Sequence, residues 1–176
     1  SACTKKNTRT SIVFEGIEEI HAPAGTVTEE SLLAGVSAKD SKGKSKDVTV
    51  DLGGADLSKP GRYIIDYKCG EEVKREAVYI YGDISYYVND EVITGNTAEI
   101  TFAEAITSLN FGKVVTATDS FGNTIDVTKL AGSDAFNYEV GEYTAMYSAT
   151  DKAGQTLEKT ITFTVTSDVQ MTVQEG

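Results

Sequence analysis

The chain has 176 residues, 40% of them apolar, and a formal net charge of -11 at pH 7. This acidity argues against nucleic acid or an anionic lipid surface as a partner, because both attract basic proteins. One histidine and two cysteines leave few residues from which to assemble a zinc site or a His-based catalytic centre, and the many Thr, Val, Ile and Tyr residues favour strands. We expect a non-catalytic, all-β protein whose chain does not insert into a membrane, since no apolar run approaches the roughly 18 residues that span a bilayer.

Residues 1–8 form an N-terminal segment that contains Cys3. The small residues before Cys3 resemble the end of a bacterial lipoprotein signal, which implies a lipid anchor on that cysteine. Alternatively, Cys3 pairs with Cys69, and the disulfide closes a long loop and stabilises the fold by roughly 4 kcal/mol. In a third interpretation the chain begins at Ser1 after loss of an initiator methionine. Spacing does not decide among the three, because disulfide geometry depends on the fold.

The next predicted elements are strands at 11–14 and 17–20, followed by a short helix that Thr28 caps. A second helix is predicted later in the chain, where Thr101 and Glu104 have the spacing of a capping box. The apolar stripe of that helix is expected at Ala105, Ile106 and Leu109. One short helix therefore recurs before each copy of the motif that follows.

A motif at 36–49 is repeated at 115–128. In each copy a short alternating strand leads into Asp40-Ser-Lys-Gly43 or Asp119-Ser-Phe-Gly122, and a second strand follows. These are expected to be tight turns, because Asp bonds its own backbone two residues on and Gly accepts positive φ. The motif therefore predicts a hairpin, and its repetition indicates that the chain is a duplication.

The acids of these turns also raise calcium as an alternative, since clustered carboxylates bind it. The turns account for Asp40 and Asp119 without a metal, and no Asp-x-Asp cluster accompanies them. We therefore expect no cofactor.

A tyrosine strand follows each hairpin and predicts which side chains face the core. Tyr63, Ile65 and Tyr67 lie on one face of the first strand. The matching residues of the second strand are Tyr143, Ala145, Tyr147 and Ala149. Tyr63 and Tyr143 each follow a turn glycine and resemble the tyrosine corner of Greek-key sandwiches, which implies a structural role. The closing strand of the second unit is expected to turn Leu157, Ile161, Phe163 and Val165 inward.

The junction between the two copies is rich in tyrosine. Four of them, Tyr79, Tyr81, Tyr86 and Tyr87, lie within ten residues with almost no linker. We expect them to form an aromatic contact between domains. The alternative is a ligand surface, since aromatic side chains with a polar tip are enriched at interfaces.

The tail at 167–176 has the pattern of the first strand of a third unit. Its apolar face consists of Val169, Met171 and Val173. One interpretation is a piece cut from a longer repeat protein, and another is a strand that packs back on the second unit. A third is strand addition to the sheet edge of a neighbouring subunit.

Several short motifs recur in the same order in both copies: Val-x-Ala-x-Asp-x-x-Gly, then Asp-Val-Thr, then Gly-x-Tyr-x-x-x-Tyr. The second copy adds Ala149-Thr-Asp-Lys-Ala-Gly154. This pattern resembles the Ig-like repeats of bacterial surface proteins, a cadherin-like sandwich family. The resemblance covers 9–81 and 82–166, and the first copy lacks the Ala-Thr-Asp-Lys-Ala-Gly turn. It implies two tandem Ig-like Greek-key β-sandwich domains, each with one short helical turn. It also implies an extracellular or cell-surface module that acts as a spacer, an adhesive or a protein-binding domain.

Two other functions fit the same pattern. The first is a self-assembling subunit of a phage decoration or fibre protein, at the virion surface, or of an extracellular filament, joined through the tail. The second is a carbohydrate-binding accessory domain that uses the junction tyrosines for a glycan. A protein partner or self-association is expected for the surface module and for the self-assembling subunit.

Overall fold

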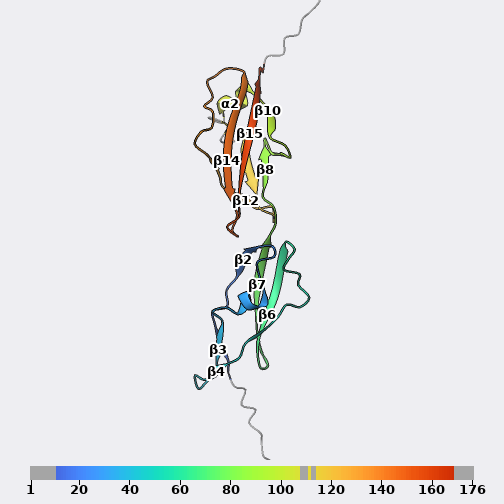
Figure 1. Ribbon diagram of the computed structural model, residues 1–176, viewed down its shortest axis with the longest axis vertical. Helices are drawn as coiled ribbons and strands as arrows, with labels where there is room; N and C mark the ends of the chain where they lie inside the picture. Colours follow the sequence, from blue (N-terminus) through green and yellow to red (C-terminus); the bar gives the residue numbers. More distant parts are fainter. Residues whose placement is uncertain (1–10, 108–110, 112–113, 169–176) are drawn as a thin grey trace, which may run out of the picture. The chain divides into compact units, whose positions relative to one another are not determined.

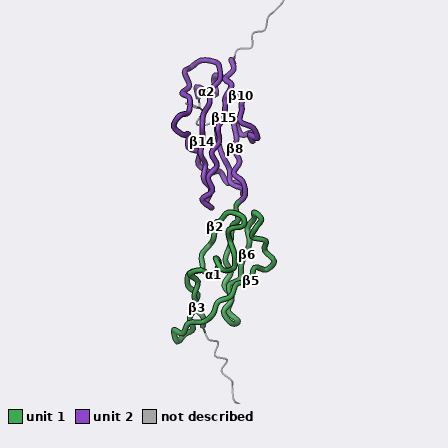
Figure 2. Tube along the Cα trace, viewed as in Figure 1, with its two compact units in different colours: residues 1–81 green, residues 82–176 purple. Residues whose placement is uncertain are grey.

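The computed structural model describes residues 11–107, 111 and 114–168. Strands dominate, and the described part contains two short helices, neither long nor apolar enough to cross a membrane. The chain divides into two compact units, Ser1–Tyr81 and Gly82–Gly176 (Figure 2). The protein is therefore all-β.

Unit 1 is built from two sheets, with strand orders β1-β3-β4 and β2-β7-β6-β5 (Figure 1). Its described elements are β1 (Val13–Glu15), β2 (Ile20–Pro23), α1 (Glu29–Leu33), β3 (Ser37–Lys39), β4 (Ser45–Lys46), β5 (Thr49–Asp51), β6 (Gly61–Cys69) and β7 (Glu72–Tyr81). The core of the unit is formed by the inner face of β6 and β7, α1 and the loop after β5. Its buried members are Leu32, Leu57, Ile65, Tyr67, Val78 and Ile80.

Unit 2 is also built from two sheets, β9-β8-β11-β12 and β10-β15-β14-β13, which contribute to one core. Its described elements are β8 (Ser85–Val88), β9 (Glu91–Val92), β10 (Thr97–Thr101), α2 (Phe102–Thr107), β11 (Val115–Thr118), β12 (Thr124–Ile125), β13 (Val127–Lys129), β14 (Gly141–Thr150) and β15 (Thr156–Thr166). The predicted inward residues of the tyrosine strand are all buried, as are Ile161, Phe163 and Val165 of β15.

The strand order of unit 1 is repeated in unit 2. The order β1-β3-β4 corresponds to β8-β11-β12, and β2-β7-β6-β5 corresponds to β10-β15-β14-β13. The correspondence includes the single parallel pair of each described unit, β2 with β7 and β10 with β15. Strand β9 has no counterpart in the described part of unit 1. The repeat in the sequence therefore has a structural counterpart, with one addition in the second copy.

Three turns share one geometry, as the motif predicted for two of them. In each, an Asp carboxylate accepts the backbone N–H groups two and four residues later, with N···O distances of 2.9–3.0 Å. The three aspartates are Asp40, Asp119 and Asp151, and each is followed three residues later by a glycine with φ near +80°. Because the side chains replace missing backbone partners, these acids are part of the turns.

Both predicted helix caps are confirmed. Thr28 caps α1 in a capping box with Ser31, and Thr101 and Glu104 exchange the two hydrogen bonds of a capping box at α2. The predicted stripe of α2 is wrong for Ile106, which is exposed, whereas Ala105 is fully buried. The helix has six residues, so few positions can face the core. Leu109 lies outside the described residues.

Two strand assignments differ from the sequence prediction. The first strands are 13–15 and 20–23 rather than 11–14 and 17–20. Strand β2 lies at a sheet edge, where Pro23 is tolerated because its missing N–H removes no inner ladder bond. Leu157 is exposed rather than inward, because it lies beside the β14–β15 turn, where the core ends.

Candidate functional site

Two of the predicted tyrosines lie in an outer-face cluster on the sheet of unit 1. The parallel pairing of β2 with β7 places His21 beside Tyr79, and their rings stack with centroids 4.8 Å apart and planes 2° apart. Arg62 of β6 lies opposite Tyr79, donates from Nε to its hydroxyl over 3.2 Å, and holds its guanidinium 5.7 Å from the ring centroid. We call His21, Arg62, Tyr79 and Tyr81 the outer-face cluster.

Polar contacts connect this cluster to an acid. The Nδ1 atom of His21 lies 2.7 Å from the hydroxyl of Tyr81, and its Nε2 lies 2.7 Å from a carboxylate oxygen of Glu19. A carboxylate, an imidazole and a hydroxyl in sequence have the connectivity of a catalytic triad. Tyr81, at the end of this series, is 2% exposed. The contacts fix the orientation of the rings.

The other two predicted tyrosines belong to unit 2. Tyr86 is 2% exposed and donates its hydroxyl to the carbonyl of Leu157 over 2.6 Å, and burial raises its pKa to about 12. Tyr86 is therefore a core residue and not a surface for a partner. Tyr87 is half-buried, and its hydroxyl lies 3.3 Å from Oγ1 of Thr118. The predicted roles of Tyr79, Tyr81 and Tyr87 toward a partner stay predictions.

Cys69 lies buried at the end of β6 and forms no disulfide with any residue that the structure describes. Cys3, Val169, Met171 and Val173 lie outside the described residues. The lipid anchor, the disulfide and strand addition by the tail therefore stay predictions.

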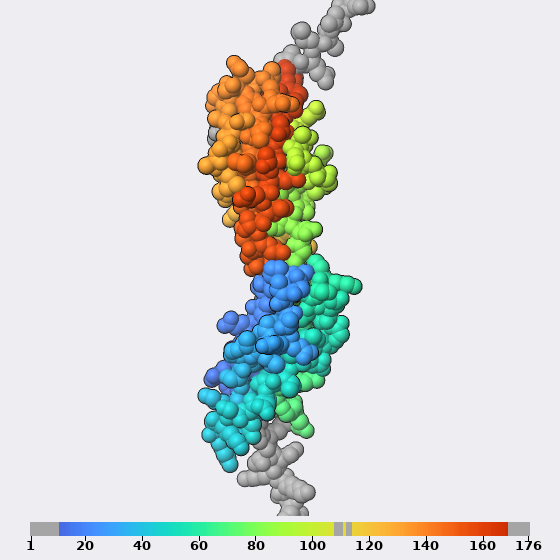
Figure 3. Space-filling model, viewed as in Figure 1, coloured from blue at the N-terminus to red at the C-terminus, as the bar shows by residue number. Residues whose placement is uncertain are grey.

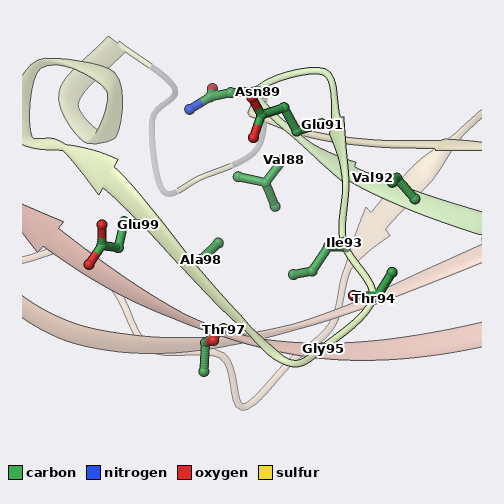
Figure 4. Close-up of a pocket in the computed structure, with 10 residues that line it drawn as sticks. All are labelled: Val88, Asn89, Glu91, Val92, Ile93, Thr94, Gly95, Thr97, Ala98 and Glu99. Atoms are coloured by element: carbon green, nitrogen blue, oxygen red, sulfur yellow. The ribbon is translucent and has the colours of Figure 1, made fainter.

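A groove in unit 2 was not predicted from the sequence. It lies between β9 and β10, the edge strands of the two sheets, and has a volume of about 530 Å³ (Figure 4). It is lined by Val88, Asn89, Glu91, Val92, Ile93, Thr94, Gly95, Thr97, Ala98 and Glu99. The groove is therefore an open side of the sandwich.

The groove arises from the longer connection of the second copy. Eight residues separate β8 from β10, against four between β1 and β2. Asn89 and Asp90 have φ values of 48° and 63°, the positive values that a two-residue I′ hairpin turn requires and that Asn and Asp tolerate. The side chain of Asn89 also donates to Glu104 of α2 over 2.8 Å. This turn folds the chain back as β9 and leaves a gap beside β10. A comparison of the two connection lengths would have signalled the extra turn.

One wall of the groove is an open strand edge. Thr162 of β15 donates its N–H to the carbonyl of Asn96 over 2.8 Å, immediately before β10. In a parallel pair, alternate residues turn their backbone groups to the same neighbour, so Ala98 bonds β15 while Thr97 and Glu99 turn theirs away. Strand β10 ends its sheet, and Figure 3 shows the yellow-green residues of this segment beside red β15 at the surface of unit 2.

Four apolar side chains lie among the polar and acidic residues that line the groove. Val88, Ile93 and Ala98 point into the space that the connecting segment surrounds (Figure 4), and Val92 is 58% exposed. Among the described residues, the lining includes two glutamates, Glu91 and Glu99, and no Lys or Arg. The groove is therefore suited to a segment that combines some apolar residues with basic ones.

The charge of the protein is concentrated in the unit that contains the groove. Residues 82–176 hold 14 Asp and Glu against four Lys, a net charge of -10. Residues 1–81 hold 13 Asp and Glu against 12 Lys and Arg, a net charge of -1.

In the described part of the chain no group of three or more His, Cys, Asp or Glu side chains is arranged to hold a metal ion.

Comparisons with known proteins give limited similarity. No family model matches the chain. It is 34% identical over 138 residues to the pesticidal crystal protein Cry22Aa of Bacillus thuringiensis, which is 72% of this chain and 18% of that protein. Among solved structures, the M60 catalytic domain with the CBM51-1 and CBM51-2 domains of Clostridium perfringens ZmpB matches with 14% identity and a TM-score of 0.34, over 90% of this chain and 31% of that one. The chain thus spans about a fifth of the length of the sequence relative.

Proposed function

We propose that the chain is a non-catalytic binding module of a bacterial cell-surface or secreted protein, built from two Ig-like β-sandwich units, that recognises a protein partner. The observation that carries the proposal is the groove of unit 2, where an open strand edge lies beside apolar side chains. Such an edge offers backbone hydrogen bonds to an extended segment, and the groove selects its side chains.

Two further observations support a modular role. The two units repeat one strand order, and in each a tyrosine hydroxyl donates to the carbonyl four residues earlier, as in the tyrosine corner of Ig-like sandwiches. The sequence relative is a much longer bacterial protein, and the similarity is with one part of it. A repeated, self-contained β unit within longer bacterial chains fits a binding or spacing module. A lipid on Cys3 would fit a position at the cell surface.

Panning a random peptide library against the immobilised chain tests protein recognition. Peptides of about 12 residues are long enough for one strand. We expect enrichment of sequences that bind the chain in solution and that compete with one another for one site. If no sequence is enriched over a resin without protein, the proposal is overturned.

Glycan binding is a second candidate, favoured by the outer-face cluster of unit 1. The stacked rings of His21 and Tyr79, with the guanidinium of Arg62 beside them, offer an aromatic edge and hydrogen-bond donors. A glycan array probed with the intact chain and with Tyr79→Ala tests this candidate. Signals that the variant loses would support it, and a blank array would remove it.

Self-assembly through the tail is the remaining alternative. The intact chain and a chain lacking 167–176 are compared by analytical ultracentrifugation. An unchanged mass distribution would exclude the donor-strand role. A loss of higher assemblies in the shortened chain would support it.

A further inference from the structure

We infer that the groove of unit 2 binds an extended, positively charged segment of a partner protein, which adds as a strand to the open edge of β10. This inference rests on the proposed function and specifies the chemistry of the partner. Three features of the groove lead to it: the backbone groups of β10, the apolar walls and the distribution of charge.

The backbone groups of β10 define an extended ligand. The hydrogen bond from Thr162 to Asn96 shows which alternate residues of β10 bond to β15. By this alternation, Thr97 and Glu99 direct their N–H and C=O groups away from β15. No hydrogen bond to these groups is found within the described residues. At about 3.3 Å per residue, the five residues of β10 match a segment of similar length in a partner strand. A helix or a folded loop cannot pair with both residues.

The apolar walls define the pattern of the ligand. Every second side chain of an added strand faces the interior of the sandwich. There it meets Ile93 and Ala98, which are partly buried against the core of unit 2, and the rim of the buried Val88 (Figure 4). The intervening side chains face outward. The segment is therefore expected to alternate apolar residues with polar ones.

Charge defines the polar residues of the ligand. Glu91 and Glu99 line the groove, the described part of its lining holds no basic residue, and unit 2 carries a net charge of -10. Lys and Arg in the segment are therefore attracted over a range that salt shortens. The tail of a second copy is disfavoured as the occupant, because residues 167–176 contain Asp168 and Glu175 and no Lys or Arg. The groove therefore favours a basic segment of another protein.

Synthetic peptides of alternating Lys and Val, with blocked ends and a fluorescent label, provide the probe. Binding to the intact chain is measured by fluorescence anisotropy. We expect saturable binding at about 50 mM salt and a weaker affinity at about 500 mM, where screening is stronger. A peptide of alternating Glu and Val serves as the charge control and is expected not to bind.

Peptide methylation then separates strand addition from simple charge attraction. One peptide is N-methylated on every Val and a second on every Lys, so each loses the donors along one edge only. Because an added strand uses one edge, we expect one methylated peptide to lose about ten-fold in affinity or more, while the other binds like the parent. This comparison uses the unaltered protein and does not depend on the folding of a variant.

Two variants at Glu99 test the same point from the protein side. Glu99→Ala removes the carboxylate and keeps the N–H, whereas Glu99→Pro also removes the donor on the open edge without deleting a bond to β15. We expect the affinity for the Lys–Val peptide to fall a few-fold in Glu99→Ala and by about a further ten-fold in Glu99→Pro. Glu158→Ala, on the exposed face of β15 and outside the groove, is the control and keeps the parent affinity.

Several outcomes overturn the inference. Strand addition is contradicted if the two methylated peptides lose the same affinity, or if a folded Glu99→Pro variant binds the Lys–Val peptide like the parent. The basic character of the segment is contradicted if the Glu–Val peptide binds as tightly as the Lys–Val peptide. Self-association of the chain that excludes the Lys–Val peptide from the groove would assign the groove to a second copy. If library panning enriches peptides without basic residues, protein recognition stands and only this inference fails.

Discussion

Tyr143 donates its hydroxyl hydrogen to the carbonyl oxygen of Glu139 over 2.6 Å, and Tyr63 forms the matching bond to Lys59 over 2.8 Å. Tyr143→Phe leaves that carbonyl without its partner, so we expect the free energy of unfolding to fall by about 1 kcal/mol. Tyr63 is less buried than Tyr143, so its carbonyl regains water and Tyr63→Phe is expected to cost less. Urea unfolding followed by circular dichroism measures both, and an effect of Tyr63→Phe larger than that of Tyr143→Phe would contradict this explanation.

Tyr147 provides the opposite case in the same strand. Its hydroxyl is buried, and within the described residues it forms no hydrogen bond. A buried polar group without a partner costs roughly 1–3 kcal/mol, so Tyr147→Phe is expected to leave the stability unchanged or to raise it. Thermal unfolding of this variant, measured beside Tyr143→Phe, checks the expectation. A fall in Tm similar to that of Tyr143→Phe would show that the hydroxyl has a partner.

Much of the fold could be predicted from the sequence, because its determinants are local. Asp40 and Asp119 form the expected turns since the carboxylate bonds N–H groups within four residues. The alternation of Tyr63, Ile65 and Tyr67 predicted the inner face of β6, because the pleat fixes which side chains share a side.

The sites could not be predicted, because they depend on pairings between distant residues. The position of His21 against Tyr79 follows from a parallel register across 58 residues, which no local pattern specifies. The groove depends on the position of β9 at the edge of its sheet. Whether the backbone groups of Glu99 are open depends on which alternate residues of β10 bond to β15. Leu157 has the right alternation but lies beside the β14–β15 turn and is 41% exposed.

The turn at Asp119 is expected to contribute more to stability than its length suggests. Asp119 is 4% exposed, and its carboxylate accepts hydrogen bonds from the N–H groups of Phe121 and Asn123 at 2.9 and 3.0 Å. Asp119→Ala removes the acceptor of both hydrogen bonds, and we expect a loss of about 2 kcal/mol in the free energy of unfolding. Asp119→Asn keeps an acceptor oxygen and is expected to lose less. Equal losses in the two variants, measured by urea unfolding, would contradict the role of the side-chain acceptor.

Alkaline pH is expected to destabilise the protein through its buried tyrosines. Burial raises the pKa of Tyr67 and Tyr147, and that of Tyr86 to about 12. Because the folded-state pKa lies above the unfolded value near 10, this contribution to stability is complete below about pH 10 and is lost as pH rises toward 12. Thermal unfolding at pH steps between these values measures the loss. Absorbance of tyrosinate should rise in two phases, the later one with unfolding, and a single phase near pH 10 would contradict the shifts.

Cys69 is expected to behave as a buried apolar residue in the native protein. It has no disulfide partner among the described residues, is 5% exposed, and lies at the end of β6 opposite Glu72. Since a thiol reacts through contact of its thiolate with the reagent, we expect alkylation of Cys69 to be slow in buffer and fast in urea. Tryptic peptide masses measured over time follow Cys69 separately from Cys3. Cys69→Ala is expected to be more stable than Cys69→Ser, because the serine hydroxyl would be buried in an apolar site. Fast alkylation in buffer, or a native peptide that links Cys69 to Cys3, would contradict this assignment.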